Sequence, residues 1–286
     1  MNMDVEDADN VLRRLWDKDV RAWHEHWVPI FRRFAHDLVL DARISAGQIV
    51  LDVGTGTGIA AIETARSAEP GGFTLGIDRS GPMLTKAEAY ASKTKNVLFF
   101  KMSADHMLFP NELFDVVISN CGISYPTFPR AVSEVFRVLR KGGSFTFNDW
   151  HLIDVPAHRT FSDILQRYRT ENPSAKLRVE RTALATLERI GNQYSDVTVQ
   201  VKALQRAGFE NIQAKRRKYE IRLQGVQEYL DMRLQRAALK QELREMSRVQ
   251  RAGLLKQLKS ELKPFVGDRR FVFDWQVTFV RAKKQF

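Results

Sequence analysis

Apolar residues recur every three or four positions over the first forty residues of the chain. Between Val11 and Asp41 the recurring positions are Leu12, Leu15, Trp16, Val20, Trp23, Trp27, Ile30, Phe31, Phe34, Leu38 and Leu40. This spacing is typical of amphipathic helices. Because proline fits the first turn of a helix, the pattern predicts two helices, the second of which begins near Pro29.

Short apolar runs replace this pattern between residues 46 and 150. Strands are predicted at 48–53, 73–78, 96–102, 115–120 and 144–149, and helices near 58–68, 81–93 and 129–140. Strands and helices that alternate at these lengths build a parallel sheet with helices on both faces. Ligands of such sheets bind beyond the carboxyl ends of the strands. The polar residues at or near these ends are Asp52, Asp78, Asp105, Asn120 and Asp149.

Residues 151–286 continue with a polar, charged stretch and then return to strand patterns. Helices are predicted at Phe161–Arg169, at Ala183–Ile190 and at Thr198–Ala207, which Gly208 ends, and strands in 208–223 and 270–281. Between these two strands Val226–Val266 reads as a helical excursion. Within it, Ser247 followed by Gln250 matches a capping box at the start of a helix.

The stretch IVLDVGTGTGIAAIETA (Ile49–Ala65) carries the strongest chemical signal. Its strand ends in Gly54, Gly56 and Gly58, and a helical pattern follows. Glycines let the backbone turn sharply and approach a ligand closely. Asp78 ends the next strand, twenty residues after Gly58. Nucleotide-binding folds place a carboxylate for ribose hydroxyls at about this distance, but the spacing here is GxGxG and not the GxGxxG of NAD enzymes.

The segments VLDVGTGTG, GIDRSGPML, SAD, FDVVISN and FRVLRKGGSF resemble, in order and spacing, class I methyltransferases that use S-adenosylmethionine (SAM). The resemblance covers residues 49–147 and is nearest to the ubiquinone/menaquinone-biosynthesis-like group of small-molecule enzymes. It implies an α/β, Rossmann-like fold with a seven-stranded sheet, mostly parallel with an antiparallel last strand. N-terminal helices and helical insertions would form a substrate cap.

The resemblance also implies a division of the chain. Residues 1–45 would be the N-terminal helical cap and 46–150 the SAM-binding core. Residues 151–196 would be a helical lid insertion, and 197–286 would complete the core sheet with a helical excursion at 225–266.

SAM is the cofactor that the resemblance implies, and S-adenosylhomocysteine is its product. The glycine loop would fold around the methionine part of SAM, and Asp78 would accept hydrogen bonds from the ribose hydroxyls. Asp105 would accept from the adenine amine, while Asp52 would support the loop and the amino group of SAM. Asn120 would place its backbone carbonyl or side chain near that ammonium. The predicted cofactor residues are Asp52, Gly54, Thr55, Gly56, Gly58, Asp78, Arg79, Met83, Ala104, Asp105, His106 and Asn120. For Met83, packing in the core is an alternative.

Methyl transfer needs few catalytic side chains because the sulfonium already makes SAM an activated methyl donor. A general base is needed only if the methyl acceptor must lose a proton. The first candidate base is His151, and the others are Asp149, His24, His26 and Tyr125. Structural or surface roles stay open for the histidines. The single cysteine, Cys121, provides neither a disulfide framework nor a zinc ligand set, so no metal site is predicted.

Cys121 lies in ISNCGIS, which resembles the equivalent stretch of arsenite methyltransferases. Those enzymes hold arsenic with several cysteines, so a chain with one thiol is not expected to do so. The composition predicts a cytoplasmic protein: it has one cysteine, an acidic polar start and no apolar run of about twenty residues. Peripheral membrane contact stays open, as does the choice between monomer and homodimer.

Charge is distributed unevenly along the chain. Residues 1–150 hold 17 basic and 19 acidic side chains, whereas residues 151–286 hold 28 and 15. A basic half can attract nucleic acid, anionic membranes or an acidic substrate, or it can consist of solvated helix faces. The sequence at 120–123, Asn-Cys-Gly-Ile, lacks the (N/D)PP(Y/F) motif of adenine amino-methylases, and no RNA-binding signature is recognisable. A small organic acceptor is therefore expected, with an RNA or other macromolecular methyltransferase and a non-catalytic SAM-binding module as alternatives.

Overall fold

The computed structural model describes residues 3–123, 127–151, 155–194 and 196–285. It begins with helices α1 (Val5–Ala22) and α2 (Val28–Ala42), joined by a π-helical turn, η1 (Trp23–Trp27). The carboxylate of Asp4 caps α1 by accepting the amide of Asp7 at 2.8 Å. Both predicted N-terminal helices are present, and Pro29 lies in the first turn of α2 as expected.

The alternating segment follows in the predicted order. Its elements are β1 (Ile49–Val53), α3 (Ile59–Ser67), β2 (Phe73–Asp78), α4 (Gly81–Tyr90), β3 (Val97–Lys101), β4 (Phe114–Asn120), α5 (Phe128–Val138) and β5 (Leu139–His151). β5 starts earlier than predicted because Phe114 pairs with Leu139 while Val116 pairs with Ser144. The residues between Leu139 and Ser144 form an irregularity in the ladder, where the sequence suggested a helix end and turn.

The C-terminal half contains longer helices than its sequence pattern predicts. Its elements are α6 (Pro156–Tyr168), α7 (Ala175–Tyr194), α8 (Val197–Ala207), β6 (Phe209–Leu223), α9 (Val226–Leu234), α10 (Ala237–Glu245), α11 (Arg248–Glu261), η3 (Lys263–Phe265), β7 (Val266–Gly267) and β8 (Arg270–Lys284). Gly208 ends α8 with a left-handed φ of 100°. Ser247 and Gln250 form both hydrogen bonds of a capping box at the start of α11, as predicted.

The strands form one sheet in the order β3-β2-β1-β4-β5-β8-β6, with β7 paired to β8. Pairs β1–β2, β1–β4, β2–β3 and β4–β5 are parallel. The predicted fold class, a mostly parallel α/β sheet that ends in antiparallel strands, is confirmed. The eighth strand is the two-residue β7, which forms an antiparallel hairpin with the start of β8. Strand order reverses between β1 and β4, and a reversal of this kind marks the ligand crevice of open α/β sheets.

The described chain divides into two compact units. Unit 1 holds residues 1–27, 150–186 and 217–277, and unit 2 holds residues 28–149, 187–216 and 278–286. Strands β5, β6 and β8 each contribute residues to both units.

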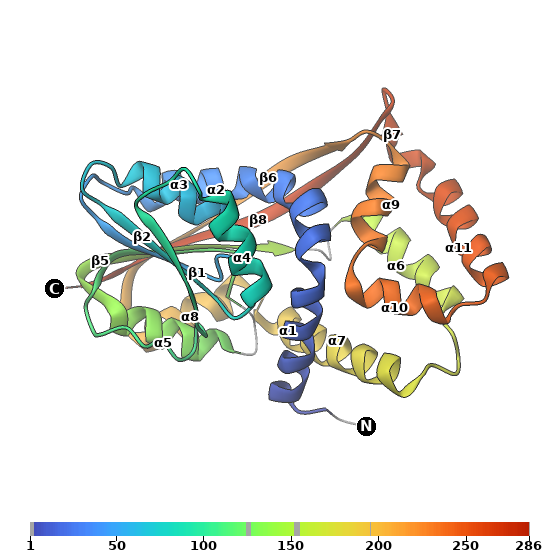
Figure 1. The fold of residues 1–286 in the computed structure, drawn as a ribbon, viewed down its shortest axis with the longest axis horizontal. Coiled ribbons are helices and arrows are strands. Elements are labelled where there is room, and N and C mark those ends of the chain that lie inside the picture. The colour runs from blue at the N-terminus through green and yellow to red at the C-terminus, as the bar shows by residue number, and fades with distance from the viewer. Residues whose placement is uncertain (1–2, 124–126, 152–154, 195, 286) are drawn as a thin grey trace. The chain divides into compact units, whose positions relative to one another are not determined.

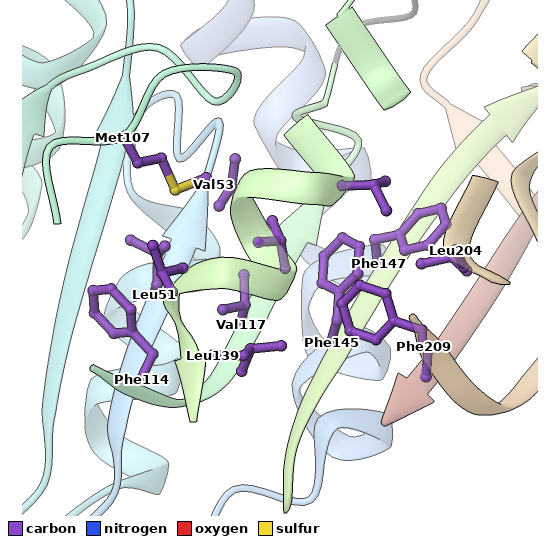
Figure 2. Packing of buried hydrophobic residues seen from close by; sticks show 14 of the residues in the cluster. Leu51, Val53, Met107, Phe114, Val117, Leu139, Phe145, Phe147, Leu204 and Phe209 are labelled. Atoms are coloured by element: carbon purple, nitrogen blue, oxygen red, sulfur yellow. The ribbon is translucent and has the colours of Figure 1, made fainter. Parts of the chain in front are cut away.

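Unit 2 has its core on both faces of the parallel strands. Helices α2 and α3 cover one face, and α5 and α8 cover the other (Figure 1). Figure 2 shows Leu51 and Val117 from neighbouring strands in one cluster with Phe145, Leu204 and Phe209. Each fully buried side chain of this size contributes roughly 1.5–3 kcal/mol relative to an exposed one, so the cluster fixes the strand ends that follow it.

Unit 1 gathers aromatic side chains. All five tryptophans of the chain belong to it and contact one another through ring pairs 5.1–6.0 Å apart: Trp16, Trp23, Trp27, Trp150 and Trp275. The rings of Trp23 and Trp27, from the π-helical turn, are stacked at 9°. The indole N–H of Trp27 donates to the carbonyl of Met232 at 3.1 Å, which ties η1 to α9.

Candidate functional site

The glycine loop after β1 is fixed to the end of β2. The amides of Gly54 and Thr55 both donate to the carbonyl of Ile77 at 2.9 Å. Gly54, Gly56 and Gly58 have φ values of 70°, 54° and 82°, a region that side chains disfavour. A Cβ on Gly54 would lie 2.4 Å from the carbonyl oxygen of Gly122, so the loop needs glycine there for space as well.

Asp52 lies beneath this loop and is fully buried. Its Oδ2 accepts the hydroxyl of Thr55 at 2.7 Å, and its Oδ1 is buried without a hydrogen-bond partner. Burial raises the pKa of Asp52 to about 7, and the nearby carboxyl of Asp78 adds to this rise. The side chain is therefore poised between its neutral and charged forms near neutral pH, and a bound cation would favour the charged form.

Asp78, the last residue of β2, holds the loop from the other side. Its Oδ2 accepts the amide of Gly56 and its Oδ1 accepts the amide of Ser80, both at 2.9 Å. Burial raises the pKa of Asp78, while these two amides oppose the rise. Each carboxylate oxygen can accept a further hydrogen bond. The predicted residues Asp52, Thr55, Gly56 and Asp78 thus form one connected group at the carboxyl ends of β1 and β2.

The residues predicted to surround the adenosine lie after β2 and β3. Ser80 caps α4 by accepting the amide of Met83 at 3.3 Å. The Met83 side chain is only 3% exposed, which fits the alternative of a core role. Arg79 and Ala104 are half-buried, and His106 is exposed.

Asp105 already has partners in this structure. Its Oδ1 accepts the hydroxyl of Ser103, and its Oδ2 lies 3.4 Å from the guanidinium of Arg130 on α5. The predicted role toward the adenine amine would use the lone pairs that these contacts leave.

Asn120, the last residue of β4, pairs in register with Asn148 of β5. The Asn148 amide donates to Oδ1 of Asn120 at 2.9 Å and accepts the amide of Cys121, also at 2.9 Å. Asn148 was not among the residues predicted for the site. Its 28-residue separation from Asn120 is set by strand pairing, and the only available signal was its position near the predicted end of the fifth strand.

The predicted general bases are divided between the two units. Asp149 belongs to unit 2, is buried, and accepts the side-chain amide of Gln200 at 3.1 Å. His24, in η1, and His151, at the end of β5, belong to unit 1, as does His26. The His151 side chain and the whole of Tyr125 lie outside the described residues.

Cys121 follows Asn120 with a left-handed φ of 53°. Its thiol donates to Oδ1 of Asn148 at 3.2 Å. Burial, and then the carboxyl of Asp149, raises the pKa of this thiol well above its ordinary value. The thiolate is the nucleophilic form, so Cys121 is poorly suited to nucleophilic chemistry at neutral pH.

A buried histidine in unit 1 was not foreseen from the sequence. The side chain of His158 is 3% exposed, and its Nδ1 lies 2.9 Å from the hydroxyl of Tyr229. That hydroxyl donates to the carbonyl of Ala157 at 3.0 Å, so the proton between the rings belongs to Nδ1. Burial, and then the charge of Arg233, lowers the pKa of His158 well below its ordinary value. His158 is therefore neutral at physiological pH.

Within the described ranges, no group of three or more histidine, cysteine, aspartate or glutamate side chains is arranged to hold a metal ion. No helix of the same ranges combines the length and the apolar character that crossing a bilayer requires.

The glycine loop, Asp52 and Asp78 lie in the part of the chain that is similar to known sequences. The sequence model of a family described as methyltransferase domain matches residues 50–143, which include this group. This part of the chain is therefore similar to methyltransferase domains.

Curated relatives share this part of the chain. An arsenite methyltransferase of Halobacterium salinarum is 33% identical over 111 residues, which is 38% of this chain and 28% of the relative. A demethylmenaquinone methyltransferase of Symbiobacterium thermophilum is 28% identical over 152 residues, which is 49% of this chain and 59% of the relative. The chain thus spans less than two thirds of the length of the relatives it matches.

A solved structure extends the likeness of the fold to most of the chain. Phosphoethanolamine N-methyltransferase 2 of Haemonchus contortus, solved with phosphomonomethylethanolamine and S-adenosylhomocysteine, has a TM-score of 0.52 to this chain. The match covers 94% of this chain and 58% of that one at 18% sequence identity. At this identity the likeness concerns the fold, and it agrees with the α/β fold of class I methyltransferases.

Proposed function

We propose that this protein is a SAM-dependent methyltransferase that acts on a small organic molecule. The observation that carries the proposal is the connected group at the ends of β1 and β2. There, Asp52 and Asp78 hold a glycine loop between them and keep lone pairs for a ligand. The predicted cofactor residues from Asp52 to Asn120 all belong to unit 2, and we propose them as the binding site for SAM.

SAM suits this group chemically because it carries a sulfonium, an ammonium and two ribose hydroxyls. Asp78 can accept hydrogen bonds from the hydroxyls, and bonds to a carboxylate are stronger than neutral ones. Asp52 can interact with the ammonium, which would favour its ionised form. Glycine at position 54 lets the backbone approach the methionine part. Correct placement of the two reactants alone can lower the barrier by roughly 7–11 kcal/mol.

The acceptor is proposed to be small, as the names of the relatives suggest for those proteins. Arsenite is an unsuitable acceptor because Cys121 is the only thiol of the chain. An acceptor that must lose a proton would need one of the proposed bases, Asp149, His151, His24 or Tyr125. We further propose that residues 1–45 and 151–196, together with the excursion at 225–266, determine which acceptor is used.

The basic C-terminal half gives little support to a nucleic-acid substrate. On β6, Lys215 pairs with Asp41 at 3.0 Å and Lys218 pairs with Asp274 at 2.7 Å. Charges that are already paired attract a polyanion weakly. A cytoplasmic location, a monomeric or homodimeric state and any peripheral contact with membranes stay predictions from the sequence.

The cofactor site can be tested by calorimetric titration with SAM and S-adenosylhomocysteine. We expect micromolar binding by the natural chain and a loss of about a hundredfold in Asp78→Ala, because two charge-assisted hydrogen bonds disappear. Asp163→Ala, at an exposed position of α6, removes the same group elsewhere and is expected to bind normally.

Binding by both variants with equal affinity would reject Asp78 as a cofactor residue. A folded natural chain that binds neither compound would reject the methyltransferase proposal altogether. Binding without transfer of a tritiated methyl group to any small molecule or RNA would favour a non-catalytic SAM-binding role.

A further inference from the structure

The side-chain amide of Asn148 has only one possible orientation. Its Oδ1 accepts the backbone amide of Cys121, a group that can only donate. On the other side its Nδ2 donates to the backbone carbonyl of Phe34 at 3.3 Å, a group that can only accept. Backbone groups at both ends therefore fix which atom of the Asn148 amide is oxygen and which is nitrogen.

This orientation determines the orientation of Asn120. The second donor of Asn148 Nδ2 points to the Asn120 side chain at 2.9 Å, so the atom it meets must be the acceptor, Oδ1. The Nδ2 group of Asn120 is thereby turned away from Asn148. Asn120 is half-buried, and among the described residues its Nδ2 has no hydrogen-bond partner. Two N–H donors are left for a ligand.

The free donors lie where a ligand is expected. Asn120 ends β4, the strand that neighbours β1 at the reversal of strand order. Two residues later, the backbone of Gly122 is so close to the glycine loop that a Cβ there would lie 2.8 Å from Cα of Gly54. Asn120 is thus next to the loop that we propose binds SAM.

We propose that the Asn120 side chain donates a hydrogen bond to an oxygen atom of the bound ligand and that Asn148 is the positioning residue that enforces this polarity. The inference rests on the proposed function and adds to it. The oxygen belongs either to the carboxylate of the cofactor or to the methyl acceptor. An ammonium group or an amine proton is the wrong partner for these donors. The proposal therefore assigns the Asn120 side chain to an oxygen atom and leaves the predicted place near the ammonium of SAM to the backbone carbonyl.

Calorimetry with two cofactor analogues tests the polarity. S-adenosylhomocysteine carries both a carboxylate and an ammonium, and its decarboxylated analogue, S-adenosyl-3-thiopropylamine, keeps only the ammonium. If the oxygen is the cofactor carboxylate, Asn120→Ala should weaken S-adenosylhomocysteine about tenfold and leave the analogue unchanged. Asn120→Asp should weaken it further, because two carboxylates then face each other. Asn211→Asp places the same charge on an exposed residue of β6 and should bind like the natural chain.

A different result is expected if the oxygen belongs to the methyl acceptor. All variants would then bind S-adenosylhomocysteine equally. Transfer from tritiated SAM, tested on a panel of phenols, carboxylates and amines, would show a higher KM in Asn120→Ala for the oxygen-bearing acceptors only.

Tighter binding of S-adenosylhomocysteine by Asn120→Asp would overturn the proposal, because it would mean that the side chain faces the ammonium. Unchanged affinity together with unchanged acceptor preference in both variants would also overturn it. These outcomes leave the proposed function standing as long as the natural chain binds S-adenosylhomocysteine. Failure of that binding would end both.

The role of Asn148 needs its own variant. Asn148→Asp cannot donate to Asn120 or to the carbonyl of Phe34, so the Asn120 amide becomes free to turn over. In a variant that circular dichroism shows to be folded, we expect the preference that Asn120 confers to fall about tenfold. If the oxygen is the cofactor carboxylate, this preference is the affinity for S-adenosylhomocysteine relative to its decarboxylated analogue. If the oxygen belongs to the acceptor, it is the lower KM for oxygen-bearing acceptors. A folded Asn148→Asp variant with the natural preference would overturn the positioning role.

Discussion

Asp52 in unit 2 and His158 in unit 1 are both buried, and burial favours the neutral form of each. It raises the pKa of the Asp52 carboxyl to about 7 and lowers the pKa of the His158 imidazole. Their surroundings differ. Asp52 lies at the carboxyl end of a parallel strand beside a second carboxyl group, Asp78. His158 lies among the rings of Tyr229 and Phe273, 5.2–5.5 Å away, and the charge that lowers its pKa is a cation.

The comparison teaches that a buried titratable group does not by itself mark a ligand site. A bound cation would restore the charge of Asp52, because Asp52 precedes the last residue of β1, at the edge of the sheet where ligands bind. His158 is held by an aromatic core and a neighbouring hydroxyl, which serve the stability of unit 1. The two residues should therefore respond to different experiments.

The largest effect is expected from opening the aromatic core of unit 1. Tyr229 is fully buried, stacks on Phe271 at 4.5 Å and holds His158. Tyr229→Ala should lower the free energy of unfolding by about 3–5 kcal/mol, measured by urea denaturation and circular dichroism. Tyr90→Ala, at a position 43% exposed, should cost less than about 1 kcal/mol. Equal losses would contradict a structural role for the aromatic cluster.

The next effect concerns His158 and acid. Because its pKa is lower in the folded state, the unfolded state binds protons first as pH falls below about 6.5, and stability is lost. His158→Gln should therefore lose less unfolding free energy between pH 7.5 and pH 5 than the natural chain does, measured by urea denaturation at the two pH values. His106→Gln, at an exposed position, is the matched control. If the free energy of unfolding of His158→Gln depends on pH as it does in the natural chain, His158 is not buried in its neutral form.

The smallest effect is on cofactor affinity. Below pH 7, Asp52 increasingly takes a proton, so the affinity for S-adenosylhomocysteine should weaken about tenfold from pH 8 to pH 6. Asp52→Asn should bind about tenfold more weakly at pH 8 and show a flat pH profile by calorimetry. If affinity depends on pH in the same way in the natural chain and in Asp52→Asn, Asp52 does not interact with the ammonium of the cofactor.

In the ligand-free protein the same carboxyl works in the opposite direction to His158. Its folded pKa lies above the value of 3.8 for an unperturbed aspartate, so its contribution to stability is present at low pH and is lost as pH rises from about 4 through 7. Single variants are needed because the two slopes partly cancel in the natural chain between about pH 4 and 6.5.

Short sequence patterns predicted the turns and helix starts that depend on residues close together in the chain. The glycine spacing, the distance from Gly58 to Asp78 and the capping box at Ser247 each describe a turn or a helix start within a few residues or one crossover. These features fixed the order of the elements and one half of the candidate site. Amphipathic spacing likewise predicted α1 and α2, because a helix exposes its face in a regular pattern.

Contacts between distant residues escaped prediction because no local pattern encodes them. Asn148 reaches Asn120 through the register of β4 and β5, and the irregularity that shifts this register lies between Leu139 and Ser144. His158 and Tyr229 are 71 residues apart and meet only through packing. The charge state and polarity of the site depend on such contacts, so the sequence suggested which residues belong there but not which atoms they offer.

The concentration of all five tryptophans in unit 1 makes intrinsic fluorescence a reporter of one half of the molecule. The proposed cofactor residues are in unit 2, which contains no indole. A titration with S-adenosylhomocysteine followed by tryptophan emission would therefore record the response of unit 1 to an event in unit 2. If calorimetry detects binding and tryptophan emission also changes, binding in unit 2 alters the surroundings of the tryptophans in unit 1. If calorimetry detects binding and emission stays constant, the cofactor binds without a change around these tryptophans.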